Sequence, residues 1–242
     1  MVYLAQSPHY RKTPEMAGHL LRVNGTAAVE TADLARRAGV DRFIYASTGS
    51  VYAPSFAPLA ETSPLRRDRW YPLSKVHAEE ALALFRDDLN LTVLRPFGMY
   101  GPGQTTMLVP HLVRLVAKGD EVFIDQNPGD AADQDGLRIS LCYVDDAAEI
   151  VRRLLERQGP DVLNLAGPRA VSIREIAQQI GAEMNREPNF VMADRERETD
   201  LVADLTLLNH TVAPKFTDLE IGIRETLKAR DDQSGDQTER AA

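Results

Sequence analysis

One stretch, residues 43–82, constrains this chain most, because it joins an apolar strand to a helix that carries ionisable side chains. It reads FIYASTGSVY, then a polar loop with prolines, then WYPLSKVHAEEAL. The first part predicts a strand that ends in hydroxyl side chains, and side chains at the carboxyl end of a strand can face a ligand. This cluster consists of Ser47, Thr48 and Ser50. The second part predicts a helix with Tyr71 and Lys75 on one face, four residues apart.

The residue types at this position point to proton transfer. A free phenol has a pKa near ~10, and a cation within about 4–6 Å favours the phenolate and lowers that pKa. We therefore interpret Tyr71 as a general base whose pKa is lowered by Lys75, and Thr48 as the residue that orients a substrate hydroxyl. The alternative is that Tyr71 and Lys75 are an ordinary pair on a helix surface.

The order of motifs along nearly the whole chain resembles one known family. STGSVY is followed about twenty residues later by YPLSK, and both lie among VNGTAAVETADLARRAGVDRFIY, LRPFGMYGPGQ and RISLCYVDDAAEIV. Together they resemble the extended short-chain dehydrogenases/reductases, in the NAD-dependent epimerase/dehydratase branch that acts on nucleotide sugars. The resemblance implies an α/β fold, a Rossmann-like parallel sheet with a smaller C-terminal substrate lobe, and NAD or NADP as cofactor.

The resemblance also implies roles for particular residues. Thr48, Tyr71 and Lys75 match the catalytic positions. The cofactor would contact Leu4, Ala5, Gln6, Tyr71, Lys75 and Pro96. The nucleotide-sugar-like substrate would contact Ser50, Phe97, Gly98, Arg195 and Arg197, although the two arginines are equally consistent with ordinary surface residues.

Departures from the family pattern narrow the expected activity. Sugar dehydratases of this family carry an Asp-Glu pair after the catalytic Thr, whereas this chain has Gly49 and Ser50, which cannot exchange protons near neutral pH. We therefore expect epimerisation or simple keto/hydroxyl redox rather than dehydration. Arg22 and Gly98 stand where the 4-epimerase pattern has Asn, so we do not expect UDP-galactose or its epimer as substrate.

The glycine-rich turn that normally holds the dinucleotide pyrophosphate does not precede Val2. We expect an N-terminally truncated Rossmann domain at residues 1–135 and, at 136–229, the last sheet strands with the substrate lobe. Residues 230–242 hold no large apolar residue, which predicts a disordered tail. We expect residues 1–242 alone not to bind NAD(P) at millimolar concentration. The alternative function is therefore a non-catalytic family member that dimerises without binding cofactor.

Composition limits the partners and the compartment. The formal net charge of −8 argues against nucleic acid or an anionic membrane as the main partner. A single Cys142 excludes an intramolecular disulfide, and five scattered His give no metal-ligand spacing. Because no apolar run reaches ~18 residues and no signal peptide is present, we expect a cytoplasmic protein.

Hydrophobic periodicity predicts the elements around the site. It indicates strands at residues 2–6, 42–47, 90–95, 138–144 and 162–167 and helices at 24–38 and 71–85. Ser172 with Glu175, and Thr217 with Glu220, have the spacing of helix-capping boxes.

An alanine-lined face on the predicted helix 24–38 bears on assembly. Ala28, Ala32 and Ala35 share this face. The resemblance implies a homodimer in which this helix and the Tyr71 helix form a four-helix bundle, so that Ala35→Glu would break the dimer. Alternatively, the alanine face packs only on the sheet of its own chain.

Overall fold

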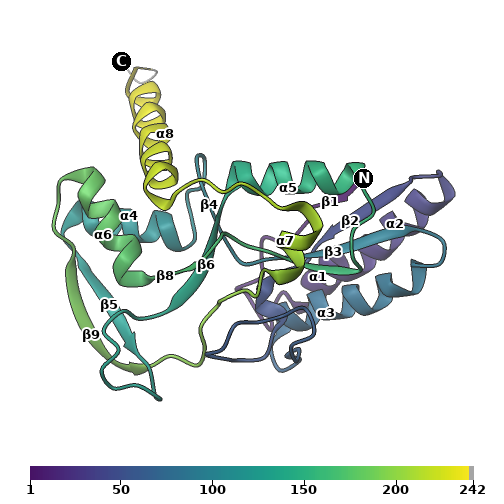
Figure 1. The fold of residues 1–242 in the computed structure, drawn as a ribbon, viewed down its shortest axis with the longest axis horizontal. Helices are drawn as coiled ribbons and strands as arrows, with labels where there is room; N and C mark the ends of the chain where they lie inside the picture. The colour runs from purple at the N-terminus through teal and green to yellow at the C-terminus, as the bar shows by residue number, and fades with distance from the viewer. Residues whose placement is uncertain (240–242) are drawn as a thin grey trace. The chain divides into compact units, whose positions relative to one another are not determined.

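The computed structural model describes the backbone of residues 1–239 and the side chains of residues 1–230. The chain divides into two compact units, which Figure 1 shows as a ribbon. The first unit comprises Met1–Phe97, Glu149–Leu165 and Ala203–Pro214. The second comprises Gly98–Ala148, Ala166–Val202 and the chain from Lys215 onward. The chain thus passes repeatedly between the units, and the division differs from the expected boundary at residue 135.

The first unit is built on a parallel sheet. Its strand order is β1-β2-β3-β7, and all three pairings are parallel. The strands are β1 (Val2–Tyr3), β2 (Arg42–Ala46), β3 (Asn90–Pro96) and β7 (Val162–Leu165). The centres of β2 and β3 are apolar and buried, as expected where both faces of a parallel sheet are covered. The predicted α/β class with a parallel sheet is confirmed.

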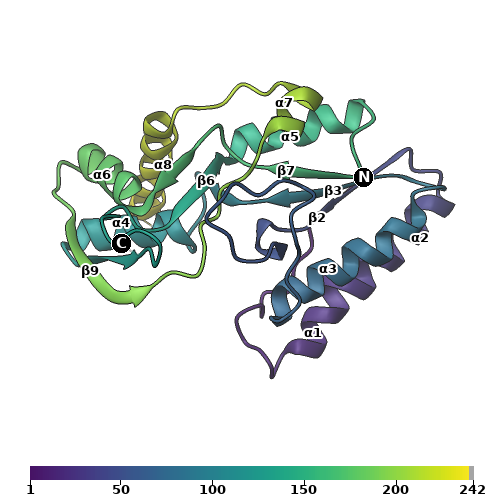
Figure 2. The same cartoon turned by 60° about the horizontal axis from the view of Figure 1, so that its bottom comes forward.

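Helices cover both faces of this sheet. Figure 2 shows α2 and α3 on one side of β2 and β3, and α7 on the other. The helices of the unit are α1 (Ala17–Leu21), α2 (Ala27–Arg37), α3 (Trp70–Leu82) and α7 (Thr206–Val212), and α5 (Val144–Glu156) spans the division between the units. Short 3-10 turns follow Thr48 (η2, Gly49–Val51) and α3 (η3, Ala83–Phe85).

A π-helical turn, η1 (Arg22–Thr26), joins α1 to α2, so the helix predicted at 24–38 is not regular at its start. The turn is held from within the chain. Asn24 is fully buried, and its side chain accepts a hydrogen bond from the Ser7 backbone N–H and donates one to Ser74 Oγ, each 3.0 Å long. The Tyr45 hydroxyl donates to the Asn24 carbonyl oxygen at 2.9 Å.

The alanine face of α2 is filled by the protein's own chain. Ala28, Ala32 and Ala35 are at most 1% exposed, and they pack in one cluster with Phe43 and Leu82. The expectation that this face meets a second copy was therefore wrong, and the alternative, packing within the chain, is confirmed.

The described part of the second unit contains two small sheets and, besides the start of α5, the helices α4, α6 and α8. One sheet has the order β4-β6-β8, with β4 parallel and β8 antiparallel to β6; the other pairs β5 and β9 in parallel. The strands are β4 (Gly98–Tyr100), β5 (Glu121–Gln126), β6 (Arg138–Tyr143), β8 (Ala170–Ser172) and β9 (Asn189–Glu196). The helices are α4 (Leu108–Lys118), α6 (Ile173–Met184) and α8 (Leu219–Glu239).

One predicted helix cap is confirmed and one is not. Ser172 caps α6, because its Oγ accepts a hydrogen bond from the Glu175 N–H at 3.0 Å. Thr217 instead bonds Asp146 through its backbone N–H and its hydroxyl, both at 2.8 Å. The Asp146 carboxylate thus takes the place of the reciprocal hydrogen bonds that were expected between Thr217 and Glu220.

The predicted ends of two elements also differ. Strand β1 stops at Tyr3 rather than at Gln6, because only Val2 and Tyr3 pair with β2. Helix α8 continues to Glu239, although a disordered tail was expected from Arg230. The segment contains no proline, the residue that most strongly disrupts a helix interior, so α8 can continue through it. The rest of the tail prediction, residues 240–242, lies outside the described residues.

The packing of α2 yields a stability prediction. Ala35→Glu places a carboxylate in the core between α2 and the sheet, and we expect the free energy of unfolding to fall by at least about 3 kcal/mol. The control is Ala38→Glu, because Ala38 is exposed at the C-terminal end of the same helix. It is expected to change stability by only about 0.5 kcal/mol. Urea unfolding of both variants checks this, and equal losses would contradict the packing described.

Candidate active site

The carboxyl end of β2 carries the hydroxyl cluster. Ser47 and Thr48 follow the last residue of the strand and are buried, at 6% and 9% exposure. Thr48 has extended backbone angles and caps η2, with its Oγ1 accepting a hydrogen bond from the Ser50 N–H at 3.2 Å. Ser47 Oγ donates to Glu79 on α3. Both hydroxyl groups are therefore held in defined positions.

Helix α3 brings Tyr71 and Lys75 to this strand end. The Tyr71 hydroxyl donates to Gln6 Oε1 at 3.1 Å and lies close enough to the Thr48 hydroxyl for that group to lower its pKa. Lys75 is 1% exposed, and its Nζ donates to the Ala46 carbonyl oxygen at 2.8 Å. The structure thus brings together four residues that the sequence singled out: Gln6, Thr48, Tyr71 and Lys75.

The electrostatics of the pair differ from the expectation. Burial raises the pKa of Tyr71, the hydrogen bond from Thr48 opposes this, and Lys75 is not among the groups that shift it. The reason is geometric, because Nζ of Lys75 faces the Ala46 carbonyl and lies 5.0 Å from the centre of the Tyr45 ring. The expected lowering of the phenol pKa by Lys75 was therefore wrong for the protein on its own.

Lys75 itself titrates unusually. Burial lowers the pKa of its ammonium group to about 8, and the negative charge of Glu79 opposes this shift. Because the group is nearly inaccessible to water, part of its population is neutral just above physiological pH.

Other predicted contact residues follow the carboxyl ends of β1 and β3 in the first unit. Leu4 is 70% exposed, and Ala5 and Gln6 are also exposed, beyond the end of β1. Phe97 follows Pro96 at the end of β3, and a Cβ added to Gly49 would lie 2.9 Å from the Phe97 ring. The Phe97 ring therefore rests directly against the turn that carries Ser50. The Tyr10 ring lies 5.3 Å from the Tyr71 ring.

The remaining predicted substrate residues belong to the second unit. Gly98 is packed so tightly that an added Cβ would lie 2.6 Å from Leu141. Arg195 is 71% exposed and pairs with both oxygens of Asp125 at 2.8 Å.

Arg197 differs sharply from Arg195. Its side chain is 4% exposed and is bonded to Asp133 at 2.6 Å and to Asp200 at 2.9 Å. Solvent and ligands can thus reach the Arg195 side chain but not the Arg197 side chain. Arg195 also lines a cavity of about 420 Å³ whose walls include apolar residues of α4 and β5.

The sequence did not predict a buried polar cluster that lies close to the trio. Glu79 and Arg95 form an ion pair with side chains only 6% and 4% exposed. The available signal was a charged residue at the turn after Lys75, on the same helix face, and an arginine inside the apolar strand LTVLR.

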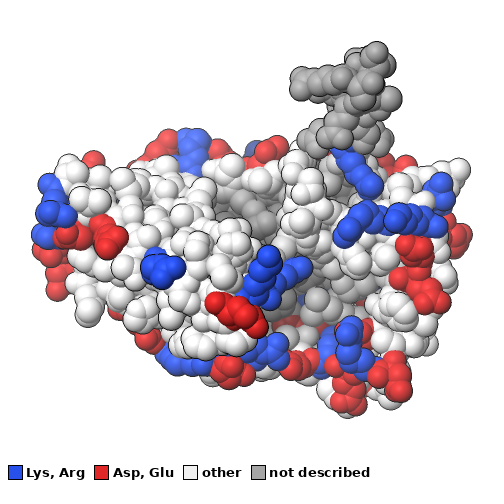
Figure 3. Space-filling model, turned by 180° about the vertical axis from the view of Figure 1, so that it is seen from behind, with Lys and Arg blue, Asp and Glu red and all other residues white. Residues whose placement is uncertain are grey.

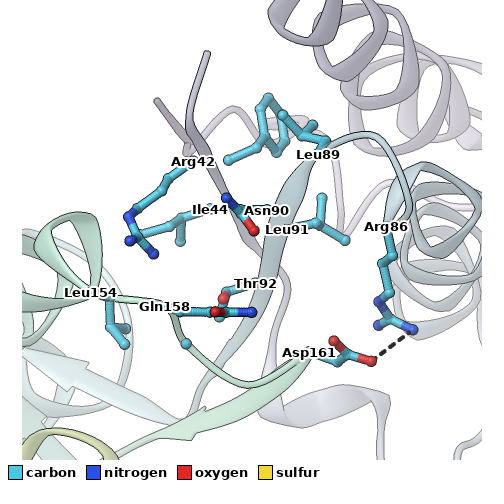
Figure 4. A pocket seen from close by; sticks show the side chains of 12 residues that line it. Arg42, Ile44, Arg86, Leu89, Asn90, Leu91, Thr92, Leu154, Gln158 and Asp161 are labelled. Atoms are coloured by element: carbon cyan, nitrogen blue, oxygen red, sulfur yellow. Dashed lines mark ion pairs between the residues drawn. The ribbon is translucent and has the colours of Figure 1, made fainter. Parts of the chain in front are cut away.

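A second pocket lies at the opposite edge of the same sheet (Figure 4). It is lined by the residues that begin β2 and β3 and by Asp161, just before β7. Arg86 at its rim pairs with Asp161 at 3.4 Å. Its volume of about 70 Å³ is too small for a nucleotide, so it does not compete with the site at the carboxyl edge.

The described residues also limit other site types. They contain no group of three or more His, Cys, Asp or Glu side chains able to hold a metal ion. Among the described helices, none is both long and apolar enough to cross a membrane. On the face drawn in Figure 3, the Lys and Arg side chains shown in blue lie among Asp and Glu side chains rather than in one broad basic patch.

Comparison with known proteins identifies relatives of this chain. A model of the NAD dependent epimerase/dehydratase family matches residues 1–166. The dTDP-4-dehydro-6-deoxy-D-allose reductase of Streptomyces bikiniensis is 27% identical over 230 residues, covering 88% of this chain and 68% of that protein. The UDP-glucuronate 4-epimerase of Thermodesulfobacterium geofontis is 27% identical over 242 residues, covering 94% of this chain and 70% of that protein.

Solved structures share the fold. UDP-glucuronic acid 4-epimerase from Bacillus cereus, in complex with UDP-glucuronic acid and NAD, superimposes with a TM-score of 0.81 at 18% identity, covering 96% of this chain and 76% of that one. MoeE5 in complex with UDP-glucuronic acid and NAD gives a TM-score of 0.80 at 23% identity, covering 96% of this chain and 79% of that one.

The buried ammonium group makes stability depend on pH. The unfolded chain keeps the Lys75 proton up to its ordinary pKa of 10.5, whereas the folded protein releases it near 8. The unfolded state therefore binds more protons in this interval, and stability rises with pH. Relative to Lys75→Met, we expect the unfolding free energy of the wild type to rise by about 2 kcal/mol between pH 8 and 9.5, at ~1.4 kcal/mol per pH unit.

Denaturant unfolding at several pH values measures this difference, and subtracting the variant cancels the contribution of every other titrating group. Lys118→Met is the control, because Lys118 is exposed at the end of α4. A pH-independent difference between the wild type and Lys75→Met would contradict the burial of a titrating ammonium.

Proposed function

Because the chain belongs to the NAD dependent epimerase/dehydratase family, we propose that it catalyses epimerisation or keto/hydroxyl redox on a nucleotide-activated sugar. The observation that supports this best is the convergence of Thr48, Tyr71 and Lys75 at the carboxyl edge of a parallel sheet. In open α/β sheets, this edge is where ligands bind.

Tyr71 is the proposed proton-transfer residue. Its raised pKa keeps it a neutral phenol at pH 7, the form that donates a proton to a carbonyl oxygen being reduced. The phenolate left by that donation is the form that accepts a proton when a hydroxyl is oxidised. Thr48 lies beside this phenol, and we assign its hydroxyl to orienting the same substrate oxygen. Gly49 and Ser50 carry no acid or base, which supports epimerisation or redox over dehydration.

The residues at the strand ends suit a nicotinamide cofactor, which supplies the hydride acceptor and donor when bound. An ammonium group has three N–H donors, and Lys75 uses one on the Ala46 carbonyl. We propose that the other two bond ribose hydroxyl groups when a cofactor lies against the carboxyl edge of the sheet. We propose that Lys75, Gln6 and Pro96 contact the cofactor, with Leu4 and Ala5 beside it.

For the substrate, we propose contacts from Ser50 and Phe97 in the first unit. In the second unit, taken by itself, Gly98 and Arg195 remain predicted substrate contacts. Arg195 suits a diphosphate because its guanidinium is exposed and its planar N–H groups match phosphate oxygens. Arg197, which the resemblance also suggested, already binds two buried carboxylates, so we assign it to holding β9 and its neighbouring loop.

Loss of the phenol tests the proposal. In a polypeptide that contains this chain and binds NAD, Tyr71→Phe is expected to lower turnover of UDP- or dTDP-sugars by roughly 10²–10⁴ while cofactor affinity stays nearly unchanged. Tyr3→Phe is the matched control, since the Tyr3 hydroxyl bonds the Val23 carbonyl away from the trio. Turnover of Tyr71→Phe within threefold of wild type would remove Tyr71 from this role, and absence of NAD binding in every form would favour the non-catalytic alternative.

We also propose that the protein is a homodimer that associates through the outer surfaces of α2 and α3. Leu34 on α2 and Leu84 in η3 are 58% and 85% exposed, and such an interface would cover both apolar side chains. Sedimentation at micromolar concentration is expected to show a dimer for the wild type and a monomer for Leu34→Lys combined with Leu84→Lys. Leu155→Lys on α5 is the control, because Leu155 is a 37% exposed leucine on another helix. A monomeric wild type would contradict the proposal.

A further inference from the structure

A buried ion pair lies directly beneath the proposed active site. Arg95 Nη2 approaches Glu79 Oε2 to 2.6 Å, and Arg95 Nε lies 3.2 Å from both carboxylate oxygens. The two side chains are 4% and 6% exposed. Burying two charges is costly, and apolar replacements of similar volume often stabilise a protein as well or better. The contacts made by this pair therefore suggest a role beyond stability.

On the Glu79 side, the pair holds the strand end that carries Thr48. Glu79 Oε1 accepts the Ser47 hydroxyl, and Ser47 directly precedes Thr48. Lys75, one turn earlier on the same face of α3, donates to the Ala46 carbonyl. Side chains on one face of α3 are thus hydrogen-bonded to Ala46 and Ser47, two consecutive residues at the end of β2.

On the Arg95 side, the pair holds the chain that leaves the same turn. Arg95 Nη1 donates to the Tyr52 hydroxyl and to the Glu61 carbonyl, both at 3.0 Å. The Tyr52 hydroxyl in turn donates to Asn164 Oδ1 on β7 at 2.6 Å. The turn that contains Thr48 is therefore fixed at both ends, by Ser47 before it and by Tyr52 after it.

We infer that Glu79, clamped by Arg95, is a positioning residue of the site: it fixes the turn that carries Thr48 against the helix that carries Tyr71 and Lys75. That the positioned side chains are catalytic rests on the proposed function. The hydrogen bonds of Glu79 and Arg95 that position them all lie within the first unit. Glu79 is hydrogen-bonded to Ser47 and Arg95 rather than to Tyr71 or Thr48, so it acts on the site through Ser47 and Lys75.

The charge of Glu79 has a second effect, on Lys75. The groups that face the ammonium are the Ala46 carbonyl and the Tyr45 ring on β2, and Glu79 on its own helix. Arg95 on β3 lies across the Glu79 carboxylate. Among these, Glu79 is the one that raises the pKa of Lys75 against the lowering caused by burial. Without its negative charge, the ammonium would lose its proton at lower pH.

Two measurements on residues 1–242 test the inference without cofactor or turnover. The first is NMR titration of the Lys75 side chain in protein labelled with ¹³C,¹⁵N-lysine, assigned with Lys75→Met. We expect a wild-type midpoint near the pKa of about 8, and a midpoint roughly one pH unit lower in Glu79→Gln. The second is hydrogen exchange of the Ser50 amide, which donates to Thr48 Oγ1. Its exchange is expected to be roughly tenfold faster in Glu79→Gln, since a 1.4 kcal/mol loss of local stability is a factor of ten.

Glu80→Gln is the matched control. Glu80 is the next residue on α3, but it is exposed and pairs with Arg67 on the surface. Both readouts should equal the wild-type values in this variant. Glu79→Asp, which keeps the charge but shortens the side chain, is expected to restore most of the Lys75 midpoint and little of the Ser50 protection.

A purely structural ion pair predicts a different pattern. Glu79→Gln would then lower the unfolding free energy but leave the Lys75 midpoint and the local exchange of the Ser50 amide unchanged, and that result would overturn the inference. If Glu79→Gln does not fold, Ser47→Ala removes the strand-end hydrogen bond and leaves the ion pair intact. We expect faster Ser50 exchange with an unchanged Lys75 midpoint in Ser47→Ala; unchanged Ser50 exchange would also overturn the inference.

Discussion

Parallel strand pairing is the constraint on which the first unit depends. Because β1, β2, β3 and β7 all run in one direction, their carboxyl ends meet at one edge of the sheet. Residues that are far apart in the chain become neighbours there, as Gln6 and Tyr71 show by their hydrogen bond. The same pairing buries both faces of the central strands, so polar groups inside this layer must find partners in the protein itself.

At this edge, burial and neighbouring polar groups have opposite effects on the pKa values of Tyr71 and Lys75. The net result is a neutral Tyr71 phenol and a Lys75 ammonium that loses its proton easily. Burial acts on both groups, raising the pKa of Tyr71 and lowering that of Lys75. Thr48 and Glu79 oppose these shifts, each through a single neighbouring contact or charge. The protonation states of Tyr71 and Lys75 therefore depend on neighbouring side chains as well as on burial.

The family resemblance was sufficient to predict the parallel sheet and the nearness of Thr48, Tyr71 and Lys75, and residue spacing was sufficient to predict the Ser172 cap. Spacing was not sufficient for the direction of the Lys75 side chain, which is set by the Ala46 carbonyl and the Tyr45 ring. It also could not show that the alanine face of α2 is covered by α3 and β2. Such details are decided by tertiary packing, which helical periodicity does not specify.

The π-helical turn at Arg22–Thr26 has a consequence for how this fold tolerates changes in chain length. An α-helix rotates by about 100° per residue, so removing one residue from the turn would turn α2 by that angle and move its alanine face away from the sheet. Asn24 fixes the turn from inside by bonding both Ser7 and Ser74. Insertions and deletions among homologous chains should therefore avoid this joint and gather in the polar loop before α3.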